Sequence, residues 1–316
     1  MPMPIFRAAV VQAASAAFDA ARTIDKMDRL VGEAARKGAK LVVLPEAFVG
    51  GYPKGLDFGA RVGTRSAEGR DWFRMYFEGT IEVPGPHTAR IGEIARAHQV
   101  YLVVGVIERA GATLYCSALF FGPDGSLLGK HRKLMPTAAE RLIWGFGDGS
   151  TLPVIETPLG GIGAVICWEN YMPMLRMAMY AKGIALYCAP TVDDRETWSS
   201  TMRHIALEGR CFVLSACQFA RRSDYPETYP LDEGTQPDAT LIRGGSLIVD
   251  PLGAVLAGPV FGEEAVLVAD IDPAQIVRGR YDLDVCGHYA RPDIFQLTVN
   301  ARPQTPVSEA GENGGG

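Results

Sequence analysis

The sequence has no long apolar run and no block of charge of one sign. A helix that crosses a membrane needs about 20 predominantly apolar residues, and the N-terminal segment turns polar after a short apolar stretch, unlike a signal peptide. Lys and Arg number 31 against 36 Asp and Glu, a formal net charge of −5, with no basic block of the kind that binds nucleic acid. We therefore expect a cytoplasmic protein with no nucleic-acid partner and no membrane partner.

Several common cofactor and catalytic motifs are also missing. The glycine-containing runs at 145–149 and 160–163 lack the spacing that cradles phosphates, and neither GxSxG nor HExxH occurs. The six cysteines form no CxxC pair and no metal-type spacing, so neither a disulfide nor a zinc site is expected. The five histidines are dispersed, which leaves a Cys–His dyad open without a supporting motif. We expect no metal and no organic cofactor.

Short β-branched, apolar runs alternate along the chain with longer stretches rich in Ala, Arg and Glu. This alternation is typical of buried strands that take turns with amphipathic helices, and 47% of the residues are apolar, enough for a large core. The sequence therefore predicts an α/β fold. Strands are expected at 6–12, 41–44, 100–108, 114–121, 163–167, 184–189, 211–217, 246–249 and 265–270, and helices at 16–37, 87–97, 174–182 and 197–208.

Turn sequences and the C-terminal composition add two expectations. The segments GPDG at 122–125 and DPLG at 250–253 are typical of hairpins, which predicts antiparallel pairs within a mixed sheet. Residues 302–316 are rich in Pro, Glu and Gly and nearly devoid of large apolar side chains. Because burial cannot offset the ordering entropy of such a segment, we predict a disordered tail.

Cys167 lies in GAVICWENYMP, where an apolar run ends and a helix is expected to begin. A turn from strand to helix lifts a side chain out of the sheet, and its backbone N–H groups stabilise both a thiolate and a developing anion. A cysteine in an apolar run is ordinarily a packing residue. The polar Glu169 and Asn170 directly after it favour a functional position.

Glu46 lies in GAKLVVLPEAFVGGYP, directly after Pro45 at the carboxyl end of an expected strand. Ligands of open α/β sheets bind beside such strand ends, and partial desolvation by Phe48 and Tyr52 would give this carboxylate a pKa suited to a general base. The alternative is an ordinary loop glutamate that caps a helix or pairs with an arginine.

Lys133 ends a basic cluster, Lys130 to Lys133, in GKHRKLMPT. Charge runs of this kind are usually solvated faces, and composition alone prefers none of the four residues. Glu140, in AAERLIWGFGDGS, is by the same reasoning an acid on the face of a helix.

Taken together, PEAFVGGYP, HRKLMPT and GAVICWENYMP resemble the nitrilase branch of the carbon–nitrogen hydrolase superfamily. That family carries a Glu–Lys–Cys triad, and the resemblance assigns it to Glu46, Lys133 and Cys167. The segment ERLIWGFGDG is similar to the stretch with a second active-site glutamate, here Glu140. Further similarity lies in YCAPTVDDRETW, HIALEGRCFVLSACQ, GGSLIVDPLG and GHYARPDIF, so that the resemblance extends from about residue 6 to residue 299.

The resemblance implies a nitrilase-type αββα sandwich, two mixed β-sheets flanked by helices, as one domain over residues 1–301. It implies hydrolysis of a small nitrile to a carboxylic acid and ammonia through a covalent cysteine thioimidate and acyl-enzyme, without metal or cofactor. It also implies a homo-oligomer built from dimers, with larger spirals or rings. CWEN is typical of nitrilases, whereas the amidases and carbamoylases tend to carry other residues after the cysteine. Tyr52, Trp144, Trp168, Thr191 and Trp198 are expected pocket walls, since apolar nitriles need an apolar slot.

Two other functions stay open on the same residues. An amidase, or a nitrile or cyanide hydratase that stops at the amide, would use the same triad. A non-catalytic assembly or binding protein would keep the scaffold, but the intact triad speaks against it. A structural role without any active site would leave three motifs at strand ends unexplained. Whether the substrate is an aliphatic, aromatic or arylacetonitrile compound, or a dinitrile, is not encoded in any of these motifs.

Overall fold

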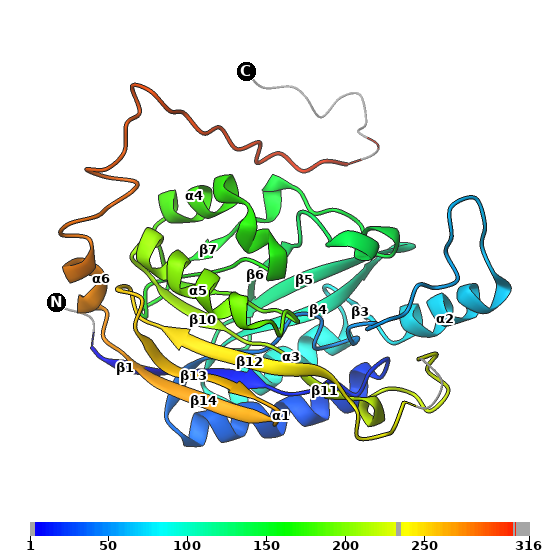
Figure 1. Ribbon diagram of the computed structural model, residues 1–316. Helices are drawn as coiled ribbons and strands as arrows, with labels where there is room; N and C mark the ends of the chain where they lie inside the picture. The colour runs from blue at the N-terminus through cyan, green and yellow to red at the C-terminus, as the bar shows by residue number, and fades with distance from the viewer. Residues whose placement is uncertain (1–3, 232–234, 306, 308–316) are drawn as a thin grey trace.

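The computed structural model describes residues 4–231, 235–305 and 307, and within them two mixed β-sheets stack against each other (Figure 1). The first sheet has the order β14-β1-β2-β4-β5-β6 with β3 beside β4, and the second has the order β11-β12-β10-β9-β8-β7 with β13 beside β12. The first sheet comprises β1 (Phe6–Gln12), β2 (Ala39–Val43), β3 (Ile81–Glu82), β4 (Tyr101–Ala110), β5 (Thr113–Phe121), β6 (Leu127–Arg132) and β14 (Ala265–Ile271). The second comprises β7 (Val154–Ile155), β8 (Gly161–Ala164), β9 (Ile184–Cys188), β10 (Phe212–Ser215), β11 (Phe219–Arg221), β12 (Thr240–Val249) and β13 (Val255–Phe261).

Each sheet has a parallel centre, β1-β2-β4 in the first and β8-β9-β10 in the second. The side chains of a strand alternate between the two faces of its sheet. In β1, Ala8 and Val10 therefore enter the core between the sheets, while Ala9 and Val11 enter the core beneath the helices. Burial of both faces explains why these strands are almost continuously apolar in sequence.

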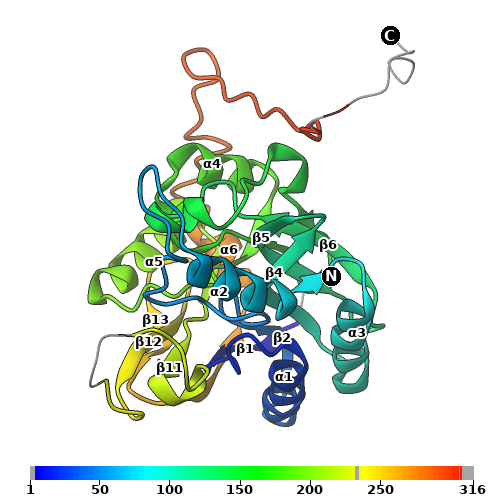
Figure 2. The same cartoon turned by 90° about the vertical axis from the view of Figure 1, so that its right-hand side faces the viewer.

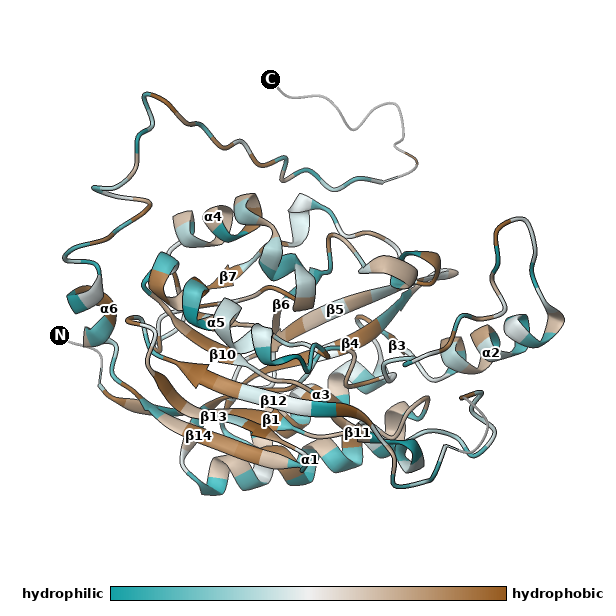
Figure 3. Cartoon of the chain, in the orientation of Figure 1, coloured by the Kyte–Doolittle hydropathy of each residue, from teal (hydrophilic) through white to brown (hydrophobic). Residues whose placement is uncertain are grey.

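Helices cover the outer face of each sheet. Helices α1 (Ala20–Arg36) and α3 (Pro86–His98) pack on the first sheet, and α4 (Pro173–Ala181) and α5 (Glu196–Gly209) pack on the second. Figure 2 shows the two helix pairs on opposite sides of the molecule, and Figure 3 shows apolar strands inside and polar helix faces outside. The predicted αββα sandwich is confirmed, with α2 (Ala67–Glu78) and α6 (Ala274–Gly279) at its ends.

The predicted strands and helices are all present, with ends that shift by a few residues. Both predicted hairpins form, between β5 and β6 and between β12 and β13. The sequence pattern missed β6, because LLGKHR has the charges of a solvated run, and β13, which is largely exposed. It also missed α2, and it extended the strand before Cys167 beyond its observed end at Ala164.

Little of the predicted tail can be described. Residues 302–305 are exposed and have no regular structure, while residues 306 and 308–316 lie outside the described residues. The domain boundary at residue 301 stays a prediction. Within the described ranges, none of the helices has both the length and the apolar character that crossing a membrane requires.

Candidate active site

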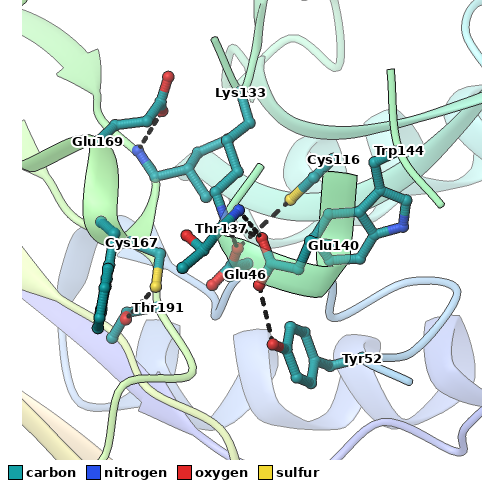
Figure 4. A network of polar contacts seen from close by, with 12 residues as sticks. Glu46, Tyr52, Cys116, Lys133, Thr137, Glu140, Trp144, Cys167, Glu169 and Thr191 are labelled. Atoms are coloured by element: carbon teal, nitrogen blue, oxygen red, sulfur yellow. Dashed lines mark hydrogen bonds and ion pairs between the residues drawn. The ribbon is translucent and has the colours of Figure 1, made fainter. Parts of the chain in front are cut away.

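Three loops at strand ends bring Glu46, Lys133 and Cys167 together (Figure 4). Glu46 follows β2 and Lys133 follows β6, both in the first sheet, whereas Cys167 follows β8 in the second sheet. All three side chains lie in the interior, with exposed fractions of 0%, 1% and 4% respectively. The site is thus built across the space between the two sheets.

Cys167 sits on a sharp turn at the start of the 3₁₀ helix η3 (Cys167–Tyr171). Its φ is +50°, a left-handed conformation that costs a non-glycine residue about 1–3 kcal/mol. The backbone N–H of Cys167 donates to the Pro190 carbonyl at 2.9 Å, and the Thr191 hydroxyl donates to the Cys167 thiol at 3.3 Å. The loop after β9 therefore holds both the backbone and the sulfur of Cys167.

Lys133 lies between two carboxylates. Its Nζ donates to Glu46 Oε1 at 2.6 Å and to Glu140 Oε2 at 2.8 Å. Glu140 is held in turn by the Tyr52 hydroxyl at 2.8 Å and by the Thr137 backbone N–H at 2.6 Å. Glu140 is therefore part of this buried network, as its predicted place beside the triad requires, and does not lie on a solvated helix face.

The Glu46 carboxylate is packed on several sides and still keeps one oxygen free. Cys116 Sγ donates to Oε1 at 3.6 Å, and the Gln218 side-chain amide donates to the Glu46 backbone carbonyl at 2.8 Å. Among the described residues, Oε2 is buried without a hydrogen-bond partner. The loop approaches β4 closely because position 105 is glycine, where a Cβ would lie 2.1 Å from the Pro45 carbonyl oxygen.

Burial and charge set the proton affinities of the three groups. Burial, opposed by Lys133 and reinforced by Glu140, raises the pKa of Glu46. Burial lowers the pKa of Lys133, but the charges of Glu46 and then of Cys167 outweigh burial. The net effect is a raised pKa, which favours the charged ammonium. Burial and the charge of Glu46 raise the pKa of Cys167. These effects oppose the stabilisation of a thiolate that the sequence predicts from the helix N-terminus.

The basic cluster before Lys133 is not a solvated face. Lys130 and Arg132 both pair with Glu108, which is 1% exposed. His131 is fully buried and uses Nε2 for Glu169 at 2.9 Å and Nδ1 for the Thr151 carbonyl at 2.7 Å. Since both ring nitrogens are engaged, His131 has none left for a Cys–His dyad.

The expected pocket walls fall into two groups. Tyr52 and Trp144 line a pocket of about 370 Å³ beside Glu140, Trp168 lines a second pocket of about 340 Å³, and Thr191 contacts the thiol. Trp198 does not join them, because it is buried in the core between α5 and the second sheet and donates to Ser215 Oγ at 2.9 Å. We therefore withdraw it as a pocket wall.

Sequence reasoning missed several residues of this site. Cys116 lies in an apolar run with no motif, and Gln218 ends the family-like segment HIALEGRCFVLSACQ, in which nothing singled it out. His131 and Glu169 lie within HRK and CWEN, where their proximity to Lys133 and Cys167 was the available signal.

All six cysteines are free thiols, five of them buried, and the described part of the chain contains no cluster of three or more potential metal ligands.

Comparison with known proteins gives matches over nearly the whole chain. The carbon–nitrogen hydrolase family model matches residues 7–281. An aliphatic nitrilase of Sinorhizobium fredii is 59% identical over 305 residues, 96% of this chain and 99% of the relative. A bifunctional nitrilase/nitrile hydratase of Lupinus angustifolius is 57% identical over 310 residues, 96% of this chain and 89% of the relative. The solved structure of the C. elegans NitFhit protein has the same fold, with a TM-score of 0.72, 22% identity, and coverage of 97% of this chain and 70% of that chain.

Proposed function

The chain belongs to the carbon–nitrogen hydrolase family, and we propose that Glu46, Lys133 and Cys167 are the triad with which it acts. It is a nitrilase, as relatives of that name at 57–59% identity over 96% of its length support. The observation that supports this triad best is the buried 2.6 Å hydrogen bond from Lys133 Nζ to Glu46 Oε1. This pair faces Cys167 (Figure 4). We assign the roles of these residues from that geometry.

In the first step the thiol attacks the nitrile carbon. The Cys167 thiol loses its proton as the C–S bond forms, and Glu46 Oε2, which has no hydrogen-bond partner among the described residues, is the acceptor. The proton then passes to the nitrile nitrogen, where the electron pair of one C–N π bond becomes the N–H bond, while the sulfur supplies the electron pair of the new C–S bond. The product is a covalent thioimidate on Cys167.

Two water molecules complete the reaction. Glu46 removes a proton from the first, which adds to the thioimidate carbon, and the protonated nitrogen leaves as ammonia to give a thioester. Glu46 activates the second water, which releases the carboxylic acid and returns the thiol. One nitrile and two waters therefore give one acid and one ammonia.

Lys133 supplies a fixed positive charge at the reacting centre. It is held between Glu46 and Glu140, and a preorganised cation stabilises tetrahedral intermediates more in a buried site than in water. The backbone N–H of Trp168, directly after the nucleophile, is a second donor for the developing anion. Glu140 and Tyr52 keep the ammonium in place.

A second product is proposed because one of the similar proteins is named a bifunctional nitrilase/nitrile hydratase. The tetrahedral intermediate that expels ammonia yields the acid, whereas expulsion of the Cys167 sulfur yields the amide. A panel of aliphatic, aromatic and arylacetonitrile compounds, with acid, amide and ammonia measured by mass spectrometry and colorimetry, tests both outcomes. Ammonia with acid is expected as the main product, and amide hydrolysis without nitrile turnover would contradict the proposal.

We also propose that the chain forms homo-oligomers built from dimers, with spirals or rings as larger assemblies. Large apolar side chains are exposed on α4, α5 and α6 and along the C-terminal segment. Exposed apolar surface of this kind is typical of protein–protein interfaces. These side chains include Met174, Leu207, Val277, Tyr281, Tyr289 and Phe295. Light scattering coupled to size-exclusion chromatography should give a multiple of 34.0 kDa, and a monomer alone would contradict this.

We propose a cytoplasmic location because the cysteines form no disulfide among the described residues. Six free thiols, five of them buried, are typical of a reducing compartment. Cell fractionation with detection of the native protein tests this, and recovery from a secreted fraction would contradict it.

A further inference from the structure

The Glu169 carboxylate lies between the loops that carry Lys133 and Cys167. Its side chain is fully buried. Oε1 accepts the Leu134 backbone N–H at 2.5 Å, and Oε2 accepts the Ile166 backbone N–H at 2.9 Å. Leu134 directly follows Lys133, and Ile166 directly precedes Cys167. One carboxylate therefore bridges the end of β6 in the first sheet and the turn after β8 in the second.

From this bridge we infer that Glu169 is a positioning residue that fixes the separation of Lys133 from Cys167. The inference rests on the proposed roles of those two residues. Hydrogen bonds to an ionised carboxylate are shorter and about twice as strong as neutral ones. Glu169 acts through the two backbone N–H groups and not on the substrate.

His131 makes a charged bridge possible at a buried position. Its Nε2 contacts Glu169 Oε2 at 2.9 Å, and Glu169 raises its pKa against the lowering effect of burial. An unpaired buried carboxylate is strongly destabilising, and a cationic partner removes most of that cost. His131 lies in β6, two residues before Lys133, so the partner of Glu169 comes from the strand that leads into the Lys133 loop.

The adjacent Asn170 restrains the same turn from the other side. Its side-chain amide donates to the Val165 carbonyl at 2.9 Å and to the Cys167 carbonyl at 2.8 Å. Together the two side chains hold the backbone on both sides of Cys167 in its strained conformation at φ +50°. In the CWEN segment, Glu169 thus holds the backbone before Cys167 against the Lys133 loop, and Asn170 ties together the carbonyl groups of Val165 and Cys167.

Glu169→Gln removes half of the bridge with little change in size. A glutamine has one acceptor oxygen and one NH₂ donor group, so one of the two backbone N–H groups would face a donor. The Lys133 and Cys167 loops would then shift relative to each other, and a shift of about 1 Å at a reacting centre costs about 100-fold in rate.

Glu108→Gln is the matched control. Glu108 is also 1% exposed and also accepts charge-assisted bonds, from Lys130 and Arg132, and it accepts the Ser117 hydroxyl at 2.9 Å. It receives no backbone N–H from the loops of Lys133 and Cys167 in the described contacts. Unfolding in urea should therefore show comparable losses of stability in both variants, and only Glu169→Gln should lose catalysis specifically.

The experiment measures kcat, KM and the rate of Cys167 alkylation by iodoacetamide in both variants, with butyronitrile or 3-phenylpropionitrile as substrate. For Glu169→Gln we expect kcat to fall about 100-fold, KM to stay within about threefold, and alkylation to slow in parallel. Equal kcat losses in the two variants, or alkylation at or above the wild-type rate in Glu169→Gln, would overturn the inference. A merely loosened site would expose the thiol and speed its alkylation.

Three further variants separate the possible failures. If Glu169→Gln does not fold, Glu169→Asp against Glu108→Asp repeats the comparison, because aspartate keeps the charge beside His131 but is too short to reach both N–H groups. If Cys167→Ala stays active, the proposed triad itself is wrong. If Cys167→Ala is inactive and Glu169→Gln and Glu169→Asp match their controls, only the positioning role is wrong.

Discussion

Lys133 Nζ donates to Glu46 Oε1 across 2.6 Å, with both side chains fully shielded from solvent. A pair of this kind is costly to break, because removal of one charge leaves the other buried and uncompensated, at about 3–5 kcal/mol. Within the part of the chain that the structure describes, the other oxygen, Glu46 Oε2, has no hydrogen-bond partner. The pair therefore combines a fixed cation with an available base at one point in the fold.

Glu46→Gln should abolish nearly all turnover, and it should also lower stability, although Glu140 still pairs with Lys133. The amide cannot accept the thiol proton, so kcat should fall about 10²–10⁴-fold. Ammonia release from the best nitrile of the panel measures this, with circular dichroism as the control for folding. Turnover near the wild-type level would require a different base.

The pH dependence of kcat/KM should report the raised pKa of Glu46. Glu46 must be ionised to act as a base, so activity is lost as the pH falls through its pKa, and the acidic limb should lie above the ordinary glutamate value of about 4.3. Glu140 contributes to the raised pKa of Glu46, so Glu140→Gln should move this limb to lower pH. A limb that stays in place or moves upward would contradict this electrostatic account.

Thr191→Val should weaken the attack by Cys167. The hydroxyl donates to the sulfur at 3.3 Å and is positioned to stabilise the charge that develops as the proton leaves. Loss of one such bond, about 1.5 kcal/mol, corresponds to about a tenfold lower kcat/KM. Thr191→Ser keeps the hydroxyl and should retain most activity; equal activity of the Val and Ser variants would exclude the role.

Gly105→Ala should disrupt the Glu46 loop. The new Cβ would lie 2.1 Å from the Pro45 carbonyl oxygen and 2.7 Å from Glu46 Cα, and overpacking of this kind typically costs about 1–3 kcal/mol. Urea unfolding and ammonia release should both show a loss. Gly129→Ala is the control, because its nearest neighbour is the mobile end of Ile155 at 3.1 Å; equal effects at the two positions would contradict the close-approach argument.

The fold was predictable from the sequence because both sheets have parallel centres buried on two faces. Strands such as β1 and β9 are almost continuously apolar, and their period and length distinguish them from the helices. β6 was not predictable in the same way. Its charges are neutralised by Glu108 and Glu169, which are distant in sequence, so the pattern resembles that of an exposed segment.

The site was predictable only in part for a similar reason. Glu46, Lys133 and Cys167 lie in the three main motifs, whereas Cys116 reaches Glu46 from a strand that carries no motif, and Gln218 from the end of a family-like segment in which nothing singled it out. Trp198 was grouped with the pocket because it is aromatic, yet the helix that carries it packs on the outer face of the second sheet. Which face a residue occupies depends on tertiary packing, and that is absent from the local sequence.

The most direct test of the triad is the detection of a covalent adduct on Cys167. Wild-type protein mixed with a slowly hydrolysed nitrile and quenched in acid should show an intact mass raised by the thioimidate or acyl group, and peptide mapping should place the addition on Cys167. The adduct should be missing in Cys167→Ala, which should fold normally because the change removes little volume. An adduct on another residue, or full nitrile hydrolysis by Cys167→Ala, would contradict the account.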